Sequence, residues 1–259
     1  MVRDHLAPWL KKRPEINSYS PTGVGLGPEE TLRQAARLHS MQGATAVVLG
    51  AGAGNEADFL APHGVKRVIG ADLEAHETRW PQRRAQLAAQ GINATFTLMD
   101  GANYALRDSS VDVVFSQSVL EHVVELDTAL AEASRILRAD GHFVAWFGPL
   151  WSTFGGSHVA ELGFDHLLVS KEELLDRGRK VGDGREYWLE LDLFNRMKYD
   201  DYIELLERHF VLEWVSVAGS PEATDFRDNN PDMWSRLREH HDEMDLMVRL
   251  VGVVGRPRR

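Results

Sequence analysis

One stretch of the sequence decides the fold, and it reads Val47-Val48-Leu49-Gly50-Ala51-Gly52-Ala53-Gly54-Asn55-Glu56. Its apolar start predicts a short strand that is buried on both faces. The glycines behind that strand permit a tight turn and let a ligand approach the backbone. A helix that begins after such a turn presents free amide donors to the same ligand. The stretch therefore predicts a strand, a binding turn and a helix in succession.

The same alternation of strands and helices continues on the C-terminal side of this stretch. We expect strands at residues 44–49, 67–71, 95–99, 111–116 and 142–147, and helices at 55–60, 74–90 and 127–139. A helix at 199–209 and strands near 210–217 and 246–253 follow. Strands that alternate with helices are typical of a parallel, doubly wound α/β sheet.

The remaining residues frame this core. We interpret residues 1–43 as an N-terminal helical lead or lid, with a helix at 28–41. Residues 44–259 are expected to form one domain, with insertions at about 148–198 and 219–245 on the side where a substrate would enter. Glycine and proline interrupt the first insertion repeatedly, which favours loops over regular elements.

Composition excludes several classes of function. The chain has 259 residues, and its 29 Lys and Arg against 39 Asp and Glu give a net charge of −10, which disfavours nucleic acid as a partner. With no cysteine, disulfides, cysteine-ligated zinc and thiol nucleophiles are excluded. Neither an apolar leader nor an uncharged run of about 20 residues is present, so we expect a cytoplasmic protein with no membrane partner. Its expected partner is a small-molecule substrate, and a homodimer is left open.

Two acids end the strands that follow the binding turn. Asp72 lies 18 residues beyond Gly54 and Asp100 precedes Gly101. An acid at the first position can accept both hydroxyls of a ribose, and one at the second can accept from an adenine amine. The alternatives are that Asp72 caps the helix at 74–90 and that Asp100 only makes a turn. The carboxyl ends of adjacent strands are where open α/β sheets bind ligands.

At this point the sequence resembles a known family, the class I S-adenosylmethionine-dependent methyltransferases, and most of all its small-molecule, ubiquinone-biosynthesis-like branch. The resemblance covers residues 44–148. It is carried by the glycine stretch, Asp72, Asp100, Asp112-Val113-Val114-Phe115-Ser116 and Val119-Leu120-Glu121-His122-Val123. It implies a Rossmann-like α/β fold, a seven-stranded sheet in the order 3-2-1-4-5-7-6 with strand 7 antiparallel, and helices on both faces.

The resemblance also implies a cofactor, S-adenosyl-L-methionine, with S-adenosyl-L-homocysteine as product, and methyl transfer to an oxygen or nitrogen of a small molecule. The backbone at Gly50, Ala51, Gly52 and Gly54 would hold its methionine and ribose end. Asp72 would bind the ribose, Leu73 would pack on the adenine, Asp100 and Gly101 would recognise the adenine, and Ser116 and Gln117 would border the methionine. One position departs from the family, because Val48 stands where an acid usually helps to orient the turn; Asn55, Glu56 or the N-terminal segment would have to compensate.

Histidine is the natural base for removing a proton from the acceptor near neutral pH. Of 11 histidines, His122, His158 and His166 fall where a substrate pocket is expected, and we take them as the catalytic candidates. By the resemblance, Glu121 and His122 are also candidates for binding a divalent metal. The alternative for this pair is that it only starts a short helix, and the alternative for His158 is an exposed loop.

Two other functions remain open from the sequence. The loss of an acid at Val48 is compatible with a protein that binds S-adenosylmethionine without transferring its methyl group. A nicotinamide-dependent oxidoreductase would need a third glycine where Asn55 stands, so that function is disfavoured.

Overall fold

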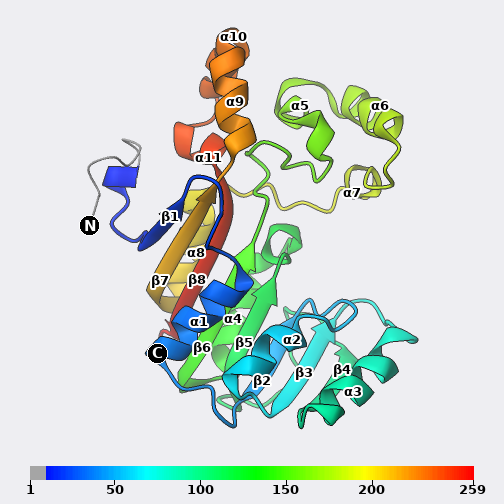
Figure 1. Cartoon of the computed structure of the whole chain (residues 1–259), viewed down its shortest axis with the longest axis vertical. Helices are drawn as coiled ribbons and strands as arrows, with labels where there is room; N and C mark the ends of the chain where they lie inside the picture. Colours follow the sequence, from blue (N-terminus) through cyan, green and yellow to red (C-terminus); the bar gives the residue numbers. More distant parts are fainter. Residues whose placement is uncertain (1–9) are drawn as a thin grey trace.

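The computed structural model describes residues 10–259, and a single mixed sheet of eight strands runs through its centre (Figure 1). The strands lie in the order β1-β7-β8-β6-β5-β2-β3-β4. Neighbours are parallel except that β8 runs antiparallel to both β6 and β7. Their bounds are β1 Ser18–Ser20, β2 Thr45–Leu49, β3 Arg67–Asp72, β4 Asn93–Leu98, β5 Val111–Gln117, β6 Leu137–Phe147, β7 Phe210–Gly219 and β8 Val248–Pro257.

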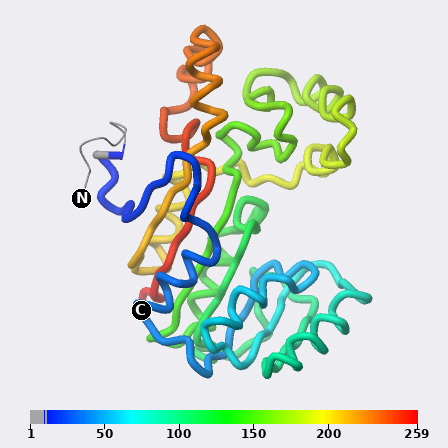
Figure 2. The backbone as a smooth tube through the Cα atoms, viewed as in Figure 1, coloured from blue at the N-terminus to red at the C-terminus, as the bar shows by residue number. Residues whose placement is uncertain are grey.

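The predicted fold class is confirmed, with one strand more than expected. When β2 is counted as strand 1, the strands follow the order 3-2-1-4-5-7-6. Strand 7, which is β8, is the antiparallel one. The expected number of seven is wrong by one, because β1 adds to the edge beside β7, with Ser18 opposite Ser216 (Figure 2). Three residues, Ser-Tyr-Ser, carry no strand pattern of their own, and the free edge of β7 makes them a strand.

Strand β2 lies at the centre of two hydrophobic cores. Val47 and Leu49 point to one face, where they join the core formed with α4 and α8. Ala46 and Val48 point to the other face, where α1 and α3 pack. Each of the four is at most 5% exposed. Burial on both faces explains why this strand is an unbroken apolar run.

Helices cover both faces of the sheet, as expected for a doubly wound fold (Figure 1). The helices of the core are α1 Pro28–Leu38, α2 Ala57–Leu60, α3 Arg79–Ala89, α4 Leu126–Ile136 and α8 Tyr199–His209. Those of the two insertions are α5 Asp165–Leu168, α6 Lys171–Val181, α7 Tyr187–Glu190, α9 Pro221–Asn229, α10 Pro231–Arg238 and α11 Glu243–Met247.

Several predicted helix boundaries were wrong, among them the end of the helix expected at 28–41, which lies at Leu38. The helix expected from residue 74 begins at Arg79. Pro81 explains the later start, because proline is tolerated in the first turn of a helix and not deeper inside it. The helix expected to reach residue 139 ends at Ile136, and β6 starts at once with Leu137. The register between β5 and β6 shifts there, and this irregularity lets β6 begin before Gly141.

Both insertions leave the carboxyl edge of the sheet, directly after β6 and β7 (Figure 2). They share a small core, in which Phe164 of the first insertion meets Ala223 and Leu237 of the second. The first is more helical than its glycines suggest. Ser170 is the N-cap of helix α6, and its hydroxyl accepts a hydrogen bond from the Glu173 amide at 3.2 Å. That Ser-x-x-Glu spacing is a helix-start signal that sequence reasoning missed.

In the part of the chain that the structure describes, no helix combines the length and the apolar character needed to cross a membrane.

Candidate active site

The glycine turn follows β2 and is fastened to the neighbouring strand. The amides of Gly50 and Ala51 both donate to the Ala71 carbonyl, at 2.9 and 3.0 Å. A Cβ on Gly50 would lie 2.3 Å from a methyl of Val119, so this glycine is required for packing. A Cβ on Gly52, which has a φ of +46°, would meet nothing within 4 Å. The turn therefore opens toward a ligand at Gly52 while it is held rigid at Gly50.

Asp72 joins the turn to the end of β3. Its Oδ2 accepts a hydrogen bond from the Gly52 amide at 2.7 Å, and its Oδ1 accepts one from Glu74 at 2.9 Å. Helix α3 starts only at Arg79, after Thr78, so Asp72 does not cap that helix and the capping alternative is wrong. A carboxylate has about four acceptor positions, and two of them remain for a ligand.

An apolar shelf lies beside Asp72 at the ends of β3 and β4. Leu73 is 74% exposed and Leu98 is 59% exposed. Leu98 pairs with Asp72 across the two strands, so both leucines belong to the same edge. Asp100 follows β4 and its Oδ1 accepts from the Ala102 amide at 2.8 Å, which makes the turn that we considered as its alternative role. The exposed leucines offer a surface on which a flat base can stack.

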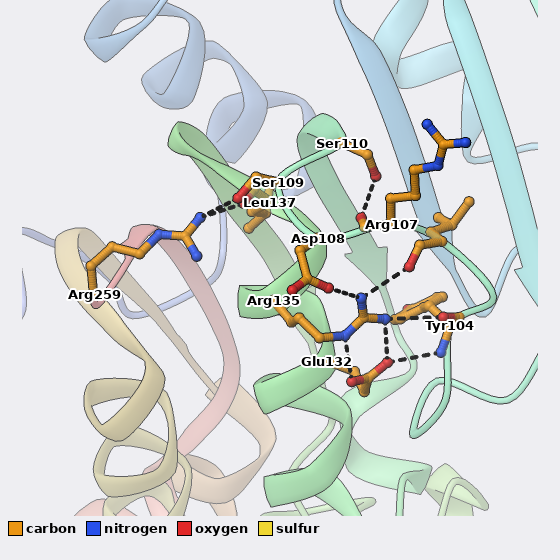
Figure 3. A network of polar contacts seen from close by, with 10 residues as sticks. Tyr104, Arg107, Asp108, Ser109, Ser110, Glu132, Arg135, Leu137 and Arg259 are labelled. Atoms are coloured by element: carbon orange, nitrogen blue, oxygen red, sulfur yellow. Dashed lines mark hydrogen bonds and ion pairs between the residues drawn. The ribbon is translucent and has the colours of Figure 1, made fainter.

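Arg135 of α4 anchors the loop between β4 and β5, which begins at this edge (Figure 3). Its guanidinium bonds Glu132 at 2.8 Å and Asp108 at 2.5 Å, and it donates to the carbonyls of Tyr104 and Leu106 at 3.0 and 2.9 Å. Glu132 in turn accepts from the Tyr104 amide. The hydrogen bond from Arg135 lowers the pKa of Glu132 below its ordinary value. The loop behind Asp100 is thus tied to the helical layer by charge-assisted bonds.

Unpaired polar atoms mark the end of β5. Ser116 is fully buried, yet its hydroxyl has no hydrogen-bond partner among residues 10–259. The side-chain oxygen of Gln117, the next residue, is also buried and unpaired within that range. A buried polar group without a partner costs roughly 1–3 kcal/mol. These atoms therefore suit a polar ligand that reaches the end of β5.

Glu56 supplies a carboxylate close to the turn. Val48, where the family usually has an acid, is 1% exposed and belongs to the core. Glu56 is half-buried, one of its oxygens has no partner in the described chain, and burial and the nearby Asp72 charge raise its pKa. Glu56 therefore has a buried carboxylate oxygen that is free to accept a hydrogen bond, as a replacement for the acid missing at Val48 requires.

A second group of side chains gathers beyond β5, around the short helical turn Leu120–His122. Glu121 is 3% exposed, and its Oε1 accepts a hydrogen bond from the Gly148 amide at 3.0 Å. Its other oxygen has no partner within residues 10–259. Burial raises the pKa of Glu121 to about 8, so the carboxyl group is largely protonated near neutral pH.

His122 and His158 meet at this place. Their ring centroids are 4.8 Å apart, and His122 stacks on Trp188 at 4.4 Å. His158 also contacts Phe194 at 5.1 Å. The Nδ1 of His122 lies 2.5 Å from the Leu193 carbonyl. The two histidines and the two aromatic side chains together form what we call the aromatic cluster.

His158 has the features of a base held in place. Its φ of +65° is uncommon for a residue with a side chain, and such backbone strain is often found at functional sites. The ring is hydrogen-bonded to the Pro149 backbone, and its Nε2 is buried without a partner in the described chain. Burial lowers the pKa of His158 to about 4, so the ring is neutral near pH 7 and Nε2 keeps its lone pair.

The structure adds His158 to the metal candidates Glu121 and His122. One potential ligand atom from each of the three lies within 4.8 Å of the others. Since histidine ligands commonly bond a carbonyl through their second nitrogen, the contact of His122 with Leu193 fits such a site. A metal at this position stays a prediction.

His166 lies in α5 and is not part of the aromatic cluster. Its Nε2 is 2.5 Å from the Trp151 carbonyl, and the two rings are in edge contact at 4.8 Å. The side chain borders a cavity of about 220 Å³ inside the first insertion, whose other lining residues include Lys171 and Arg196. Burial lowers the pKa of His166 to about 4. Of the three histidines, the structure therefore brings together His122 and His158.

Sequence reasoning missed Asn195, which fastens the segment that carries Glu121 and His122. Its side-chain amide donates to the carbonyls of Leu120 and Val123, at 2.7 and 3.1 Å. Its oxygen accepts from the Tyr202 hydroxyl at 2.7 Å. Leu120 and Val123 lie 75 and 72 residues before Asn195 in the sequence, so no local pattern signals this role.

The glycine turn, the acids and the apolar shelf lie at the carboxyl ends of parallel strands. This arrangement defines a Rossmann-like α/β protein with a site for a nucleoside-containing ligand. Comparison with known proteins narrows the class. The model of a family described as "Methyltransferase domain" matches residues 47–145.

Relatives of known sequence agree with this match. An uncharacterized methyltransferase of Mycobacterium ulcerans is 33% identical over 152 residues, which cover 57% of this chain and 55% of that protein. A dimethylglycine N-methyltransferase of Parasynechococcus marenigrum is 33% identical over 180 residues, which cover 65% of this chain and 58% of that protein. The matched region thus spans little more than half the length of these relatives.

A solved structure has the same fold. The S-adenosylmethionine-dependent methyltransferase of Mesorhizobium loti superposes with a TM-score of 0.56 at 22% identity, covering 88% of this chain and 97% of that one. Residues 47–145 match a methyltransferase domain, and the resemblance to the class I S-adenosylmethionine-dependent methyltransferases that was noted from the sequence is confirmed.

Proposed function

We propose that this chain binds S-adenosylmethionine along the ends of β2 to β5 and transfers its methyl group to an oxygen or nitrogen of a small molecule. The observation that carries the proposal is a turn open at Gly52, beside free acceptor positions on Asp72 and unpaired polar atoms at Ser116 and Gln117. These groups suit a ligand with an apolar base at one end and charged polar groups at the other.

In this proposal, different residues of the chain bind different parts of the ligand. Asp72 accepts from the ribose hydroxyls, and the shelf of Leu73 and Leu98 supports the adenine. Ser116 and Gln117 contact the methionine end, and Glu56 accepts from its amino group in place of the missing acid at Val48. The exposure of both leucines and the free oxygen of Glu56 support these assignments.

When bound, S-adenosylmethionine would supply an electrophilic methyl group to the acceptor's lone pair, with S-adenosylhomocysteine as the leaving group. The protein must hold the acceptor in line with that bond and take up the proton that the acceptor loses. We assign the proton to Nε2 of His158, since its lone pair is free and the rest of the ring is held by Pro149. His122 packs against His158 and orients it.

We expect the acceptor to be a small molecule that binds beside the aromatic cluster. Stacked and edge-on rings from His122, His158, Trp188 and Phe194 suit a flat or cationic group, because aromatic faces attract cations. Since one relative is a dimethylglycine N-methyltransferase, N-methylated glycines are the first acceptors to test.

The first experiment is a calorimetric titration of the purified chain with S-adenosylmethionine and S-adenosylhomocysteine. We expect both to bind with one site per chain, and no binding of either would overturn the proposal. Mass spectrometry of an acceptor panel, including N-methylated glycines and small phenols, then tests transfer by the gain of one methyl group. Binding without any methylated product would favour the alternative of a binding protein that does not catalyse transfer. A panel run after chelator treatment tests the metal candidates, because the His158 mechanism needs no metal.

A further inference from the structure

A second cluster of potential ligands lies away from the glycine turn, near the amino ends of β6 and β7. It consists of His39 at the C-terminal end of α1, His142 on β6 and Glu213 on β7. The proposed methyl transfer uses none of these residues, and they lie at the opposite ends of strands whose carboxyl ends carry the active site.

The spacing of the three side chains matches a metal site. The Nε2 atoms of His39 and His142 lie 3.4 and 3.6 Å from the same oxygen, Oε2 of Glu213. Zinc binds imidazole nitrogen and carboxylate oxygen at about 2.0–2.2 Å, which places neighbouring ligands of a tetrahedron about 3.3 Å apart. One ligand atom from each residue lies within 4.8 Å of the others.

Two of these ligand atoms are buried and unsatisfied. The His142 side chain is 4% exposed and that of Glu213 is 17% exposed. Neither His142 Nε2 nor Glu213 Oε2 has a hydrogen-bond partner among the residues that the structure describes. Leaving a buried polar atom unpaired is costly, so an ion that both atoms could bind explains their convergence.

The sheet directs Glu213 toward the histidines. The pairing of β7 with β8 shifts between Leu212 and Trp214, and an irregularity of this kind re-aims the side chain within it. Arg256 on β8 donates to the other carboxylate oxygen, Oε1, at 2.6 Å. This bond fixes the carboxylate and leaves Oε2 free, as a supporting residue does for a metal ligand.

The cluster is also accessible to an ion. The His39 side chain is 35% exposed, and a cavity of about 280 Å³ next to His142 is lined by Asp112 and Asp140. The two imidazole rings now stack at 3.7 Å with 23° between their planes. Because an ion is bound in the plane of an imidazole ring, the exposed His39 ring is the one that turns to complete the site.

We propose that His39, His142 and Glu213 bind one Zn²⁺ ion, with solvent as a fourth ligand. The two imidazole nitrogens and single carboxylate are a ligand set that zinc accepts. The ion would connect α1 to β6 and β7, so its role is to stabilise the packing of the N-terminal segment on the sheet.

The test is a calorimetric titration of the chelator-stripped full chain with ZnCl₂, followed by Co²⁺ absorption spectra as a probe of tetrahedral geometry. His39→Ala is the main variant, because this residue is partly exposed and its loss leaves the core intact. Glu213→Gln is the second variant, since it keeps the shape of the side chain and removes the charge. We expect one Zn²⁺ per wild-type chain from this cluster and at least a tenfold loss of affinity in each variant.

His158→Ala and His76→Ala are the controls. The first removes the only other described cluster of three such side chains, Glu121 with His122 and His158, and the second removes a histidine outside both. Both should bind Zn²⁺ at the His39 cluster as the wild type does, and Zn²⁺ should raise the melting temperature of both. Equal affinity of wild type and His39→Ala, or loss of binding only in His158→Ala, would overturn the proposal. Neither result depends on methyl transfer, so the zinc site and the proposed activity can fail separately.

Discussion

The two halves of the candidate active site are built differently. The cofactor half uses hydrogen bonds between residues close in sequence: Asp72 to Gly52 spans 20 residues, and Asp72 to Glu74 spans two. The acceptor half uses contacts between residues farther apart in the sequence. Glu121 and Gly148 are 27 residues apart, and His122 and Leu193 are 71 apart. The first half needs only the neighbouring strand ends of the central sheet and their turns, whereas the second exists only once the insertion has packed on the core.

This difference predicts that the two halves can be impaired separately. Changes at strand ends should weaken cofactor binding, and changes in the aromatic cluster should slow transfer with the cofactor still bound. The following variants test that separation.

The largest effect is expected from His158→Ala. Loss of a general base typically costs about 10²–10⁴-fold in rate, so we expect kcat to fall by about 10³-fold. The Kd for S-adenosylhomocysteine should stay within about twofold of wild type, because the contacts proposed for His158 are to the acceptor. Steady-state kinetics and calorimetry measure the two quantities. A parallel loss of cofactor affinity would show that the halves are not separate, and His76→Ala is the matched control.

Asp72→Ala should act on the other half. Two hydrogen bonds to a carboxylate are worth about 1.5 kcal/mol each, and their loss weakens S-adenosylhomocysteine binding about 100-fold. The variant also frees the Gly52 amide, which loosens the turn. Asp58→Ala, which removes an exposed partner of Arg83, is the control and should bind normally. Unchanged affinity in Asp72→Ala would contradict the assignment of the ribose site.

His166→Gln distinguishes a structural from a catalytic histidine. Burial lowers the pKa of His166 to about 4, and the nearby His241 acts in the same direction. The unfolded chain, with an ordinary histidine pKa near 6.5, therefore binds more protons between pH 6.5 and 4, and stability falls as the pH falls through this range. Between pH 6.5 and 4.5 the wild type should lose about 2 kcal/mol more unfolding free energy than the variant.

Urea unfolding at the two pH values measures this difference. The same pH dependence in wild type and variant would show that His166 is not a buried neutral histidine. A kcat loss comparable to that of His158→Ala would instead return His166 to the catalytic candidates.

The smallest effect is expected from Glu56→Ala. If Glu56 replaces the acid missing at Val48, its loss should weaken S-adenosylmethionine binding about tenfold, which corresponds to one charge-assisted hydrogen bond. Asp58→Ala, which removes a nearby exposed carboxylate that pairs with Arg83, is the control. Equal affinity of both variants for S-adenosylmethionine would contradict the assignment of Glu56 to the cofactor's amino group.

The comparison also shows which parts could be predicted. The fold class followed from the alternation of apolar runs and glycine turns, and the strand order followed from the family resemblance. Asp72 was placed correctly at the end of its strand. The edge strand β1, the helices of the first insertion and Asn195 were missed. β1 depends on pairing with β7, and Asn195 on partners more than 70 residues away.

By itself, the sequence determined the central sheet and the glycine turn at its carboxyl edge, because burial on both faces and tight turns constrain neighbouring residues directly. Tertiary structure alone decided which histidines meet. His122 and His158 lie in one aromatic cluster because the insertion places Trp188 and Phe194 around them, while His166 packs on Trp151. His39, His142 and Glu213 converge for the same reason, since helix packing and an irregular strand pairing bring together side chains that no local pattern connects.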